Sequence, residues 1–275
     1  MQTETTAVQT SQEVSALLGV PNSFILAGGT TFSPEDSEGI HFVDISGIEG
    51  LDGIKQKGTR IEIGPLATLD SLGRSGLVKK YLPALAEAAS MASPGVRDRG
   101  TLGGNLGGSP AGDLAAALMS SGAKLTVKTE VDFRELLIDR FWDPDGRNVL
   151  QYDEWISRVS VQISAEPFCG SVFGKSGEWK KDAVPTAAAV RMSLDNKNNI
   201  SSVRSGLRPG ASYVRRMFPL EKALKNRPAT EENFRKAAEA VIPSIRGVME
   251  EKEFTVFLMD ILCRCRDMAA ERRIP

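Results

Sequence analysis

Apolar residues recur at two different spacings in the first part of the chain. At 11–18 they follow the period of an amphipathic helix, and further on they form short runs typical of strands. The first run leads directly into the pair Gly28-Gly29, so a strand followed by a glycine turn is expected there. We therefore predict a helix at 11–18 and strands at 24–26, 40–45 and 59–63.

The middle of the chain combines helical segments with the highest density of glycine. Asp70 is placed to cap a short helix, and the apolar residues of 81–91 recur at helical spacing until a Ser-Pro-Gly sequence ends the pattern. A glycine-rich loop is expected at 99–113, followed by a helix at 114–120 and a strand at 124–127. A loop so rich in glycine that ends at a helix calls for an explanation.

Beyond residue 161 the pattern changes to strands followed by helices. Three strands are expected at 168–173, 186–194 and 200–207, and the turn at 195–199 joins the last two as a hairpin. The final helix, 254–272, carries one apolar stripe, which either packs within its own domain or contacts a partner. We predict two domains, 1–165, itself in two α+β parts that divide near residue 55, and 166–275.

Composition and charge narrow the class of protein. Hydrophobic residues make up 41% and charged residues 25% of the chain, which is ordinary for a globular protein. The formal net charge is −1 and the basic residues do not cluster, so we expect no nucleic-acid partner. No stretch is apolar enough to span a membrane and the first residues have no signal-peptide core, so the cytoplasm is the expected compartment.

Few residues are available for metal binding or side-chain catalysis. The three cysteines, Cys169, Cys263 and Cys265, are too few and too irregularly spaced for a disulfide framework or a cysteine-ligated metal site. The one histidine, His41, lies in a strand-like segment, where a structural role is favoured over a catalytic one. We expect no metal site and no catalytic side chain.

Two glycine-rich segments, 27–31 and 101–105, carry the candidate chemistry. Glycine lets a ligand approach backbone N–H groups closely, and successive N–H groups bind anions, so two such segments suit a diphosphate. For either segment alone, a simple tight turn is the favoured explanation, but the order Thr-x-Gly-Gly-Asn followed by Ser-Pro-x-x-Asp is harder to explain in that way. A Gly-x-Gly-x-x-Gly fingerprint is absent, and the Walker-like run at 170–176 has too short a spacing between its glycines.

Several motifs resemble the FAD-binding subunits of molybdenum hydroxylases, the xanthine dehydrogenase and carbon monoxide dehydrogenase family. The strongest are Leu-Pro-Ala-Leu-Ala-Glu-Ala-Ala at 82–89, Val-Arg-Asp-Arg-Gly-Thr-Leu-Gly-Gly-Asn at 96–105 and Ser-Pro-Ala-Gly-Asp-Leu at 109–114. Segments 26–30, 43–45 and 61–69 follow the family's order as well. The resemblance implies an α+β fold: a two-lobed FAD-binding domain of the vanillyl-alcohol oxidase (PCMH) type, followed by a smaller domain with a three-stranded sheet and helices.

The resemblance also implies which residues hold a non-covalent FAD. Backbone groups of both glycine segments would bind the diphosphate and neighbouring sugar oxygens, Asp113 would accept hydrogen bonds from sugar hydroxyls, and Ile156 and Lys175 would lie near the flavin ring. Asp113 has an alternative role as the N-cap of the helix that follows. The implied cofactor-binding residues are Ala27, Gly28, Gly29, Thr30, Thr31, Phe32, Thr101, Gly103, Gly104, Asn105, Asp113, Ile156 and Lys175.

The chain departs from the family's pattern at four places. Thr31 stands where the family usually has Asp, and Asp98 where it usually has Asn. The segment 105–113 is one residue shorter than in relatives, and Glu178-Trp179 replaces a basic pair near the flavin. The flavin is therefore expected to be held somewhat differently in this chain.

As a member of such a complex, the chain would pass electrons rather than act on a substrate. The resemblance implies a molybdenum-cofactor subunit and a 2Fe-2S subunit as partners, with electrons leaving through FAD to NAD or another acceptor. Two alternatives stay open: a stand-alone FAD-dependent oxidase or reductase of the same fold, and an assembly or binding subunit without a cofactor.

Overall fold

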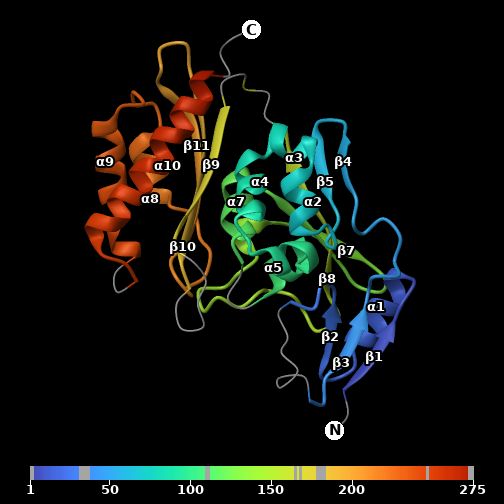
Figure 1. Cartoon of the computed structure of the whole chain (residues 1–275). Coiled ribbons are helices and arrows are strands. Elements are labelled where there is room, and N and C mark those ends of the chain that lie inside the picture. Colours follow the sequence, from blue (N-terminus) through green and yellow to red (C-terminus); the bar gives the residue numbers. More distant parts are fainter. Residues whose placement is uncertain are drawn as a thin grey trace.

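A computed structural model describes residues 3–30, 38–108, 112–163, 166, 169–177, 184–245 and 248–271. Figure 1 shows an N-terminal lobe at the lower right, a sheet with covering helices in the centre, and a C-terminal unit at the left. In the described part of the chain, no helix is both long and apolar enough to cross a membrane.

The N-terminal lobe is a small parallel sheet covered by one helix. Its elements are β1 (Glu4–Ala7), α1 (Ser11–Leu18), β2 (Ser23–Leu26) and β3 (His41–Asp44), and the strand order is β1-β3-β2. Thr10 and Glu13 form a capping box that starts α1 at the predicted residue. Val14, Val43 and Ile45 are buried in its core together with Trp155, which comes from a distant part of the chain.

An antiparallel sheet of five strands forms the centre of the molecule, in the order β4-β5-β8-β6-β7. Its strands are β4 (Ile54–Lys57), β5 (Arg60–Ile63), β6 (Lys124–Lys128), β7 (Phe133–Leu137) and β8 (Trp155–Gln162). Successive side chains of a strand point to opposite faces of the sheet. In β5, Ile61 and Ile63 therefore join the main core, whereas Glu62 between them pairs with Arg158 at 3.6 Å on the other face.

Six short helices cover one face of this sheet. They are α2 (Leu69–Arg74), α3 (Gly76–Tyr81), α4 (Pro83–Ser90), α5 (Pro94–Arg99), α6 (Leu102–Gly107) and α7 (Leu114–Ser121), and a 3-10 turn, Ile138–Arg140, follows β7. Thr68, rather than the predicted Asp70, caps α2 with its side chain. The helix expected at 81–91 is confirmed as α4, which begins two residues later than expected because Pro83 favours the first turn of a helix.

The C-terminal unit has the three predicted strands, in an antiparallel sheet of order β11-β10-β9. Its elements are β9 (Cys169–Ser176), β10 (Thr186–Leu194), β11 (Ile200–Arg208), α8 (Phe218–Leu224), α9 (Glu231–Glu239), the 3-10 turn Ile242–Ser244, and α10 (Glu251–Glu271). The turn before β11 includes Asn198 at positive φ, and its residues bond to the Asp195 carboxylate.

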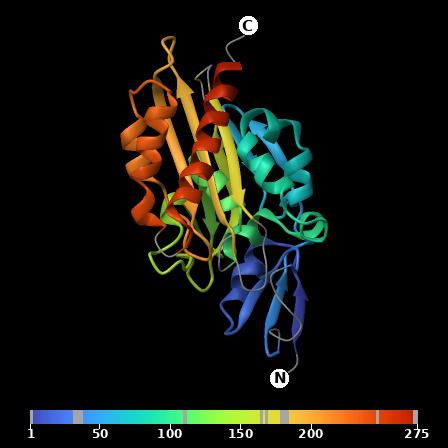
Figure 2. The same cartoon turned by 60° about the vertical axis from the view of Figure 1, so that its left-hand side comes forward.

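Two helices sandwich the C-terminal sheet, with α10 on one face and α7 of the central part on the other (Figure 2). Glycine permits both close approaches. A Cβ at Gly170 would lie 2.0 Å from the Cys265 carbonyl oxygen of α10, and one at Gly206 would lie 2.2 Å from the Ala116 oxygen of α7. The apolar stripe of α10 is therefore used for packing within the chain, as one of the two interpretations predicted.

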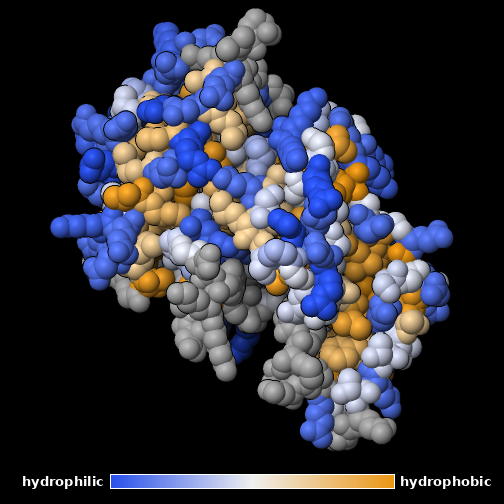
Figure 3. Space-filling view, in the orientation of Figure 1, coloured by the Kyte–Doolittle hydropathy of each residue, from blue (hydrophilic) through white to orange (hydrophobic). Residues whose placement is uncertain are grey.

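The central and C-terminal parts share one core. Phe173, Ala187 and Ala189 from the C-terminal sheet belong to the same buried cluster as the central helices. The proposed boundary near residue 165 and the division near residue 55 stay predictions. In the space-filling view, hydrophilic and hydrophobic residues are mixed over the C-terminal unit at the left, and strongly hydrophobic side chains also gather at the right, where the N-terminal lobe adjoins the rest (Figure 3).

Candidate functional site

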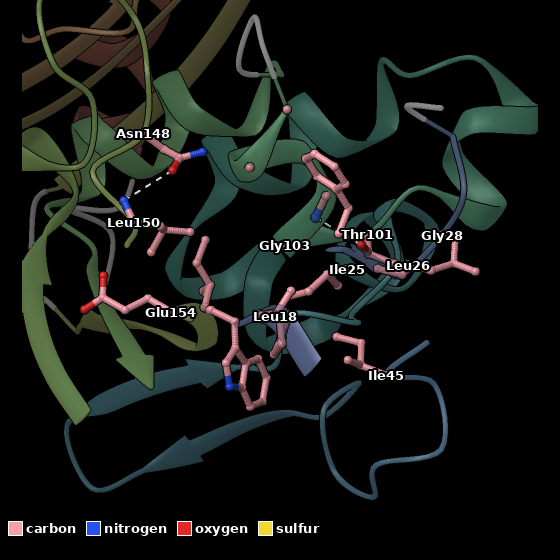
Figure 4. Close-up of a pocket in the computed structure, with 18 of the residues that line it drawn as sticks. Leu18, Ile25, Leu26, Gly28, Ile45, Thr101, Gly103, Asn148, Leu150 and Glu154 are labelled. Atoms are coloured by element: carbon pink, nitrogen blue, oxygen red, sulfur yellow. Dashed lines mark hydrogen bonds between the residues drawn. The ribbon is translucent and has the colours of Figure 1, made fainter. Parts of the chain in front are cut away.

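A cavity of about 370 Å³ lies between the N-terminal lobe and the central part of the molecule. This volume is within the range of small-molecule and cofactor sites. Aliphatic side chains of the lobe and glycines of the helical layer face it (Figure 4). Its lining is Leu18, Ser23, Phe24, Ile25, Leu26, Ala27, Gly28, Gly29, Thr30, Ile45, Pro65, Thr101, Gly103, Gly104, Gly107, Gly108, Asn148, Leu150, Gln151, Tyr152, Glu154, Trp155 and Ile156.

The structure brings the two glycine segments side by side at this cavity. A Cβ at Gly28 would lie only 1.8 Å from the carbonyl oxygen of Arg99, and one at Gly100 would lie 3.5 Å from Thr30 Oγ1. Gly29 has φ +61°, a conformation that glycine adopts without strain. The backbone contact at Gly28 therefore requires glycine and fixes the first segment against the second.

The first segment leaves its amides available. No described residue accepts a hydrogen bond from the backbone N–H of Ala27, Gly28, Gly29 or Thr30, and the same holds for Thr101 at the start of the second segment. Ala27 and Gly28 are half-buried and Thr101 is buried, whereas Gly29 and Thr30 are exposed. Amides that lack an acceptor in such a shielded place favour binding of an anion or of polar oxygens.

The second segment differs from the loop that its glycine content suggests. Residues 102–107 form α6, capped by the side chain of Thr101, which accepts from Gly104 N at 3.2 Å. Leu102 N donates to Ala67 O at 2.9 Å and Gly103 N donates to Pro65 O at 2.7 Å. Because these amides are already paired, Gly103 and Gly104 contribute a surface without side chains, and the available polar groups of this wall are the amide and hydroxyl of Thr101.

A third wall comes from residues 148–156, which sequence reasoning did not identify apart from Ile156. Asn148 Oδ1 accepts from Leu150 N at 3.2 Å and shapes the turn that places Leu150 against the cavity (Figure 4). Ile156 and Trp155, at the start of β8, are buried at the base of this wall. No local motif marks these residues, because only the pairing of β8 with β6 and β5 brings them to the site.

One ion pair holds this third wall in place. Arg134 of β7 donates from Nε to Glu154 Oε1 at 2.7 Å and from Nη2 to Oε2 at 2.8 Å. Glu154 also accepts from Gln151 N at 2.9 Å. The hydrogen bonds from Arg134, followed by that from Gln151, hold the pKa of Glu154 below its usual value.

Asp113 and Lys175 do not line the cavity. Asp113 Oδ1 accepts from Arg208 at 2.6 Å, and its Oδ2 pairs with Lys175 Nζ at 3.2 Å. Burial lowers the pKa of the Arg208 guanidinium, and the neighbouring Asp113 opposes that shift. Asp113 precedes α7 but makes no side-chain cap; Asn105 Oδ1 instead accepts from Leu114 N at 3.0 Å.

The remaining predicted positions have different outcomes. Thr31, Phe32 and the pair Glu178-Trp179 lie outside the described residues. Asn105 lies on α6 but does not face the cavity, and Asp98 is exposed on α5. Ala27, Gly28, Gly29, Thr30, Thr101, Gly103, Gly104 and Ile156 all face the same cavity.

His41, the side chain that could serve in acid–base catalysis, is held by structural contacts. His41 contacts Ser23 Oγ through Nδ1 at 3.0 Å and Thr6 Oγ1 through Nε2 at 2.9 Å, joining the three strands of the lobe. The described part of the chain contains no group of three or more His, Cys, Asp or Glu side chains placed to hold a metal ion.

Comparison with known proteins gives a consistent result. Residues 1–161 match the family model "FAD binding domain in molybdopterin dehydrogenase". The chain is 29% identical to the carbon monoxide dehydrogenase medium chain of Hydrogenophaga pseudoflava, covering 84% of this chain and 82% of that one. It is 26% identical to the xanthine dehydrogenase FAD-binding subunit of Escherichia coli O157:H7, covering 94% and 92%.

Solved structures agree over nearly the full length. A structure of carbon monoxide dehydrogenase from H. pseudoflava superposes with a TM-score of 0.86 at 27% identity, covering 99% of this chain and 98% of the other. Quinoline 2-oxidoreductase from Pseudomonas putida 86 shares the fold with a TM-score of 0.82 at 22% identity, covering 98% of each chain.

Proposed function

This chain belongs to the FAD-binding medium subunits of molybdenum hydroxylases, and from that premise we propose that its FAD lies, non-covalently bound, in the cavity between the two glycine segments. We further propose that electrons from the iron–sulfur clusters of a partner leave through this site to NAD or another acceptor. The observation that carries the proposal is that the open amides of 27–30 and the side-chain-free surface of α6 face one cavity.

The lining fits a dinucleotide in its chemistry. The amides of Ala27 to Thr30, with the amide and hydroxyl of Thr101, would hold the diphosphate and adjacent sugar oxygens. Gly103 and Gly104 let the ligand approach the α6 backbone without obstruction by a Cβ. The aliphatic side chains of Leu18, Ile45 and Ile156 would cover apolar ring surface and exclude water.

The lining also agrees with an electron-transfer role. When bound, FAD supplies the redox chemistry, since a flavin takes up electrons singly or in pairs, and the protein supplies position and electrostatics. The described lining has no His, Cys, Lys or Arg, and its one carboxylate, Glu154, is held by Arg134. Besides Glu154, Tyr152 is the one ionisable side chain among the described lining residues, so the redox chemistry at this cavity would be supplied by FAD.

We propose a molybdenum-cofactor subunit and a 2Fe-2S subunit as partners. Relatives of this chain are named as a medium chain and an FAD-binding subunit, and three cysteines cannot ligate iron–sulfur clusters of their own. In this arrangement the substrate is bound and oxidised on another subunit, and this chain determines how the electrons leave.

The test is cofactor content and affinity of the isolated full-length chain. We expect about one FAD per chain, released by acid, and saturable rebinding of FAD after its removal, measured by flavin absorbance. Co-purification of molybdenum and iron with the tagged chain from its native source tests the partners separately. A folded, colourless chain that does not bind added FAD would refute the cofactor assignment and would favour a binding subunit without a cofactor.

A further inference from the structure

A second cavity, of about 400 Å³, lies between the N-terminal lobe and the face of the central sheet opposite its helices. Strand pairing places Lys55 beside Glu62 on this face, and Lys128 beside Trp155. Trp155 belongs to this face because its neighbour Ile156 points into the main core. Among the described residues, Trp155 alone lines both this cavity and the one proposed for FAD, so the two cavities are distinct.

Positive charge exceeds negative charge in the lining of this second cavity. The described lining has three cations, Lys55, Lys128 and Arg158, and one carboxylate, Glu62. Arg158 Nη1 lies 3.6 Å from Glu62 Oε2, which is too long for a good hydrogen bond. Neither lysine forms an ion pair within the described part of the chain. A concave site with such an excess of positive charge attracts anions.

A buried donor without an acceptor belongs to the same wall. Trp155 is only 1% exposed, and its indole Nε1 has no hydrogen-bond acceptor among the described residues. Buried indole N–H groups usually have such a partner, because an unpaired one loses the hydrogen bond that water gave it in the unfolded chain. An oxygen of a ligand bound in the second cavity would supply the missing acceptor.

The edge that the N-terminal lobe contributes to this cavity is fixed by backbone contacts. Leu66 N donates to Leu51 O at 2.8 Å, on one side of the edge. Gly64 N donates to Gly53 O at 2.8 Å, on the other side. A Cβ at Gly64 would lie 1.9 Å from Leu51 O, so glycine is required for this close approach. The cavity is therefore formed before any ligand binds, which lowers the entropic cost of binding.

We propose that the second cavity binds a small molecule that carries a phosphate group. Lys55 and Lys128 would hold the phosphate, since a lysine ammonium is a compact charge with three N–H donors. The Trp155 N–H would donate to one of the phosphate oxygens. Phe133, 60% exposed and paired with Lys128 across β6 and β7, would cover an apolar or aromatic part of the ligand. The inference does not depend on the proposed function, because it uses a different cavity.

The experiment titrates the full-length chain loaded with FAD, so that the amides of the flavin cavity are already occupied. The probes are inorganic phosphate and phenyl phosphate, and sodium chloride at matched ionic strength is the control. Isothermal titration measures affinity, and the nitrogen–proton NMR signal of the Trp155 indole, identified with W155F, reports the location. We expect saturable binding, tighter for phenyl phosphate than for phosphate, and a downfield shift of the Trp155 indole proton.

Variants of the lining test the role of charge. K128M and K55M should each weaken phenyl phosphate binding about tenfold, because each removes a charged donor to the phosphate. E62Q should strengthen binding about two- to threefold, because it removes the one carboxylate of the described lining. The matched control is K124M: Lys124 lies on the same face but pairs with Glu135 at 3.9 Å and does not line the cavity.

Four results would overturn this site: no saturable binding to the FAD-loaded wild type, an equal response to sodium chloride, an unmoved Trp155 indole signal, or an equal loss of affinity in K124M. A wild-type chain that binds no FAD refutes the cofactor assignment instead. The same titration of the flavin-free chain, compared with K128M, still tests the second cavity, because Lys128 does not line the flavin cavity.

Discussion

Arg134 on β7 and Glu154 at the cavity wall are joined by two parallel hydrogen bonds, of 2.7 and 2.8 Å. The Arg134 side chain is 44% exposed, but that of Glu154 is only 7% exposed. Arg134 also donates to Val149 O at 3.3 Å, so it holds both ends of the turn that contributes Leu150 to the cavity. In Figure 4 the Glu154 carboxylate extends away from Leu18 and Ile25, which leaves the apolar lining intact.

Replacing Arg134 with alanine should therefore weaken FAD binding without removing any group that touches the cavity. A two-point arginine–carboxylate pair with one partly exposed member contributes about 1–2 kcal/mol to the free energy of unfolding. We expect a loss of that size in denaturant unfolding, together with weaker binding in flavin titrations. K124M, which removes the nearby exposed pair Lys124–Glu135, should change neither value; an equal effect of both variants would contradict this role.

The same ion pair predicts a pH dependence of stability. Because Arg134 holds the pKa of Glu154 below its usual value of 4.5, the folded state binds that proton less readily than the unfolded state. The stabilisation is complete above the unfolded pKa and is lost as the pH falls through the lower, folded pKa. Wild type should exceed E154Q in unfolding free energy at pH 6, and the difference should shrink steadily below about pH 4.5. A difference that stays constant down to pH 3 would exclude Glu154 as the titrating group.

The pattern of apolar residues predicts most elements of this fold, but not the construction of the site. Strands such as Ile200–Arg208 and the helix Ser11–Leu18 follow from alternation and helical period, because each buries one face. The helix at Leu102–Gly107 could not be predicted in this way, because its glycines disfavour a helix. It depends on hydrogen bonds to the carbonyl groups of Pro65 and Ala67, which are distant in sequence.

Side-chain roles were harder to predict than backbone roles. Gly28 and Thr101, both named from the glycine-rich segments, line the same cavity. Gly28 could be recognised because a close backbone approach requires glycine. The ligand contact expected of Asp113 stays a prediction, its expected role as a side-chain cap is wrong, and its ion pair with Arg208 of β11, 95 residues further along the chain, was not predicted. Only the packing of β11 against α7 could reveal that pair.

Gly28 provides a direct test of the contact between the two glycine segments. In G28A the new Cβ would lie 1.8 Å from Arg99 O and 2.7 Å from its carbonyl carbon, so one backbone must move. Such overpacking costs about 1–3 kcal/mol of stability, and separating the segments should weaken FAD binding more than about tenfold.

The matched control for that variant is G95A on α5. A Cβ at Gly95 meets no atom within 4 Å, and alanine is the better helix former, so G95A should bind FAD normally and be equally or slightly more stable. Isothermal titration with FAD and thermal unfolding measure both effects. Normal FAD affinity in G28A would show that the close contact at Arg99 is not required for the site.

Trp155 should report on occupancy of the cavity through its fluorescence. It lines the cavity and is only 1% exposed, whereas Trp142, 8% exposed, is buried in the main core away from the lining. A flavin bound next to an indole quenches its emission by electron and energy transfer. Titrating the flavin-free protein with FAD should therefore quench tryptophan emission, and W155F should lose the larger part of that change.

W142F is the control, because it removes a tryptophan of comparable burial while leaving the cavity wall unaltered. Its quenching on FAD addition should match that of wild type. The affinity of W155F for FAD, measured independently by flavin absorbance, shows whether the variant still binds the cofactor. If W155F binds FAD but its tryptophan emission changes only weakly, the flavin lies beside Trp155. If W155F binds FAD and is quenched as strongly as W142F, the flavin ring does not lie beside Trp155, and the position of the ring within the cavity has to be revised.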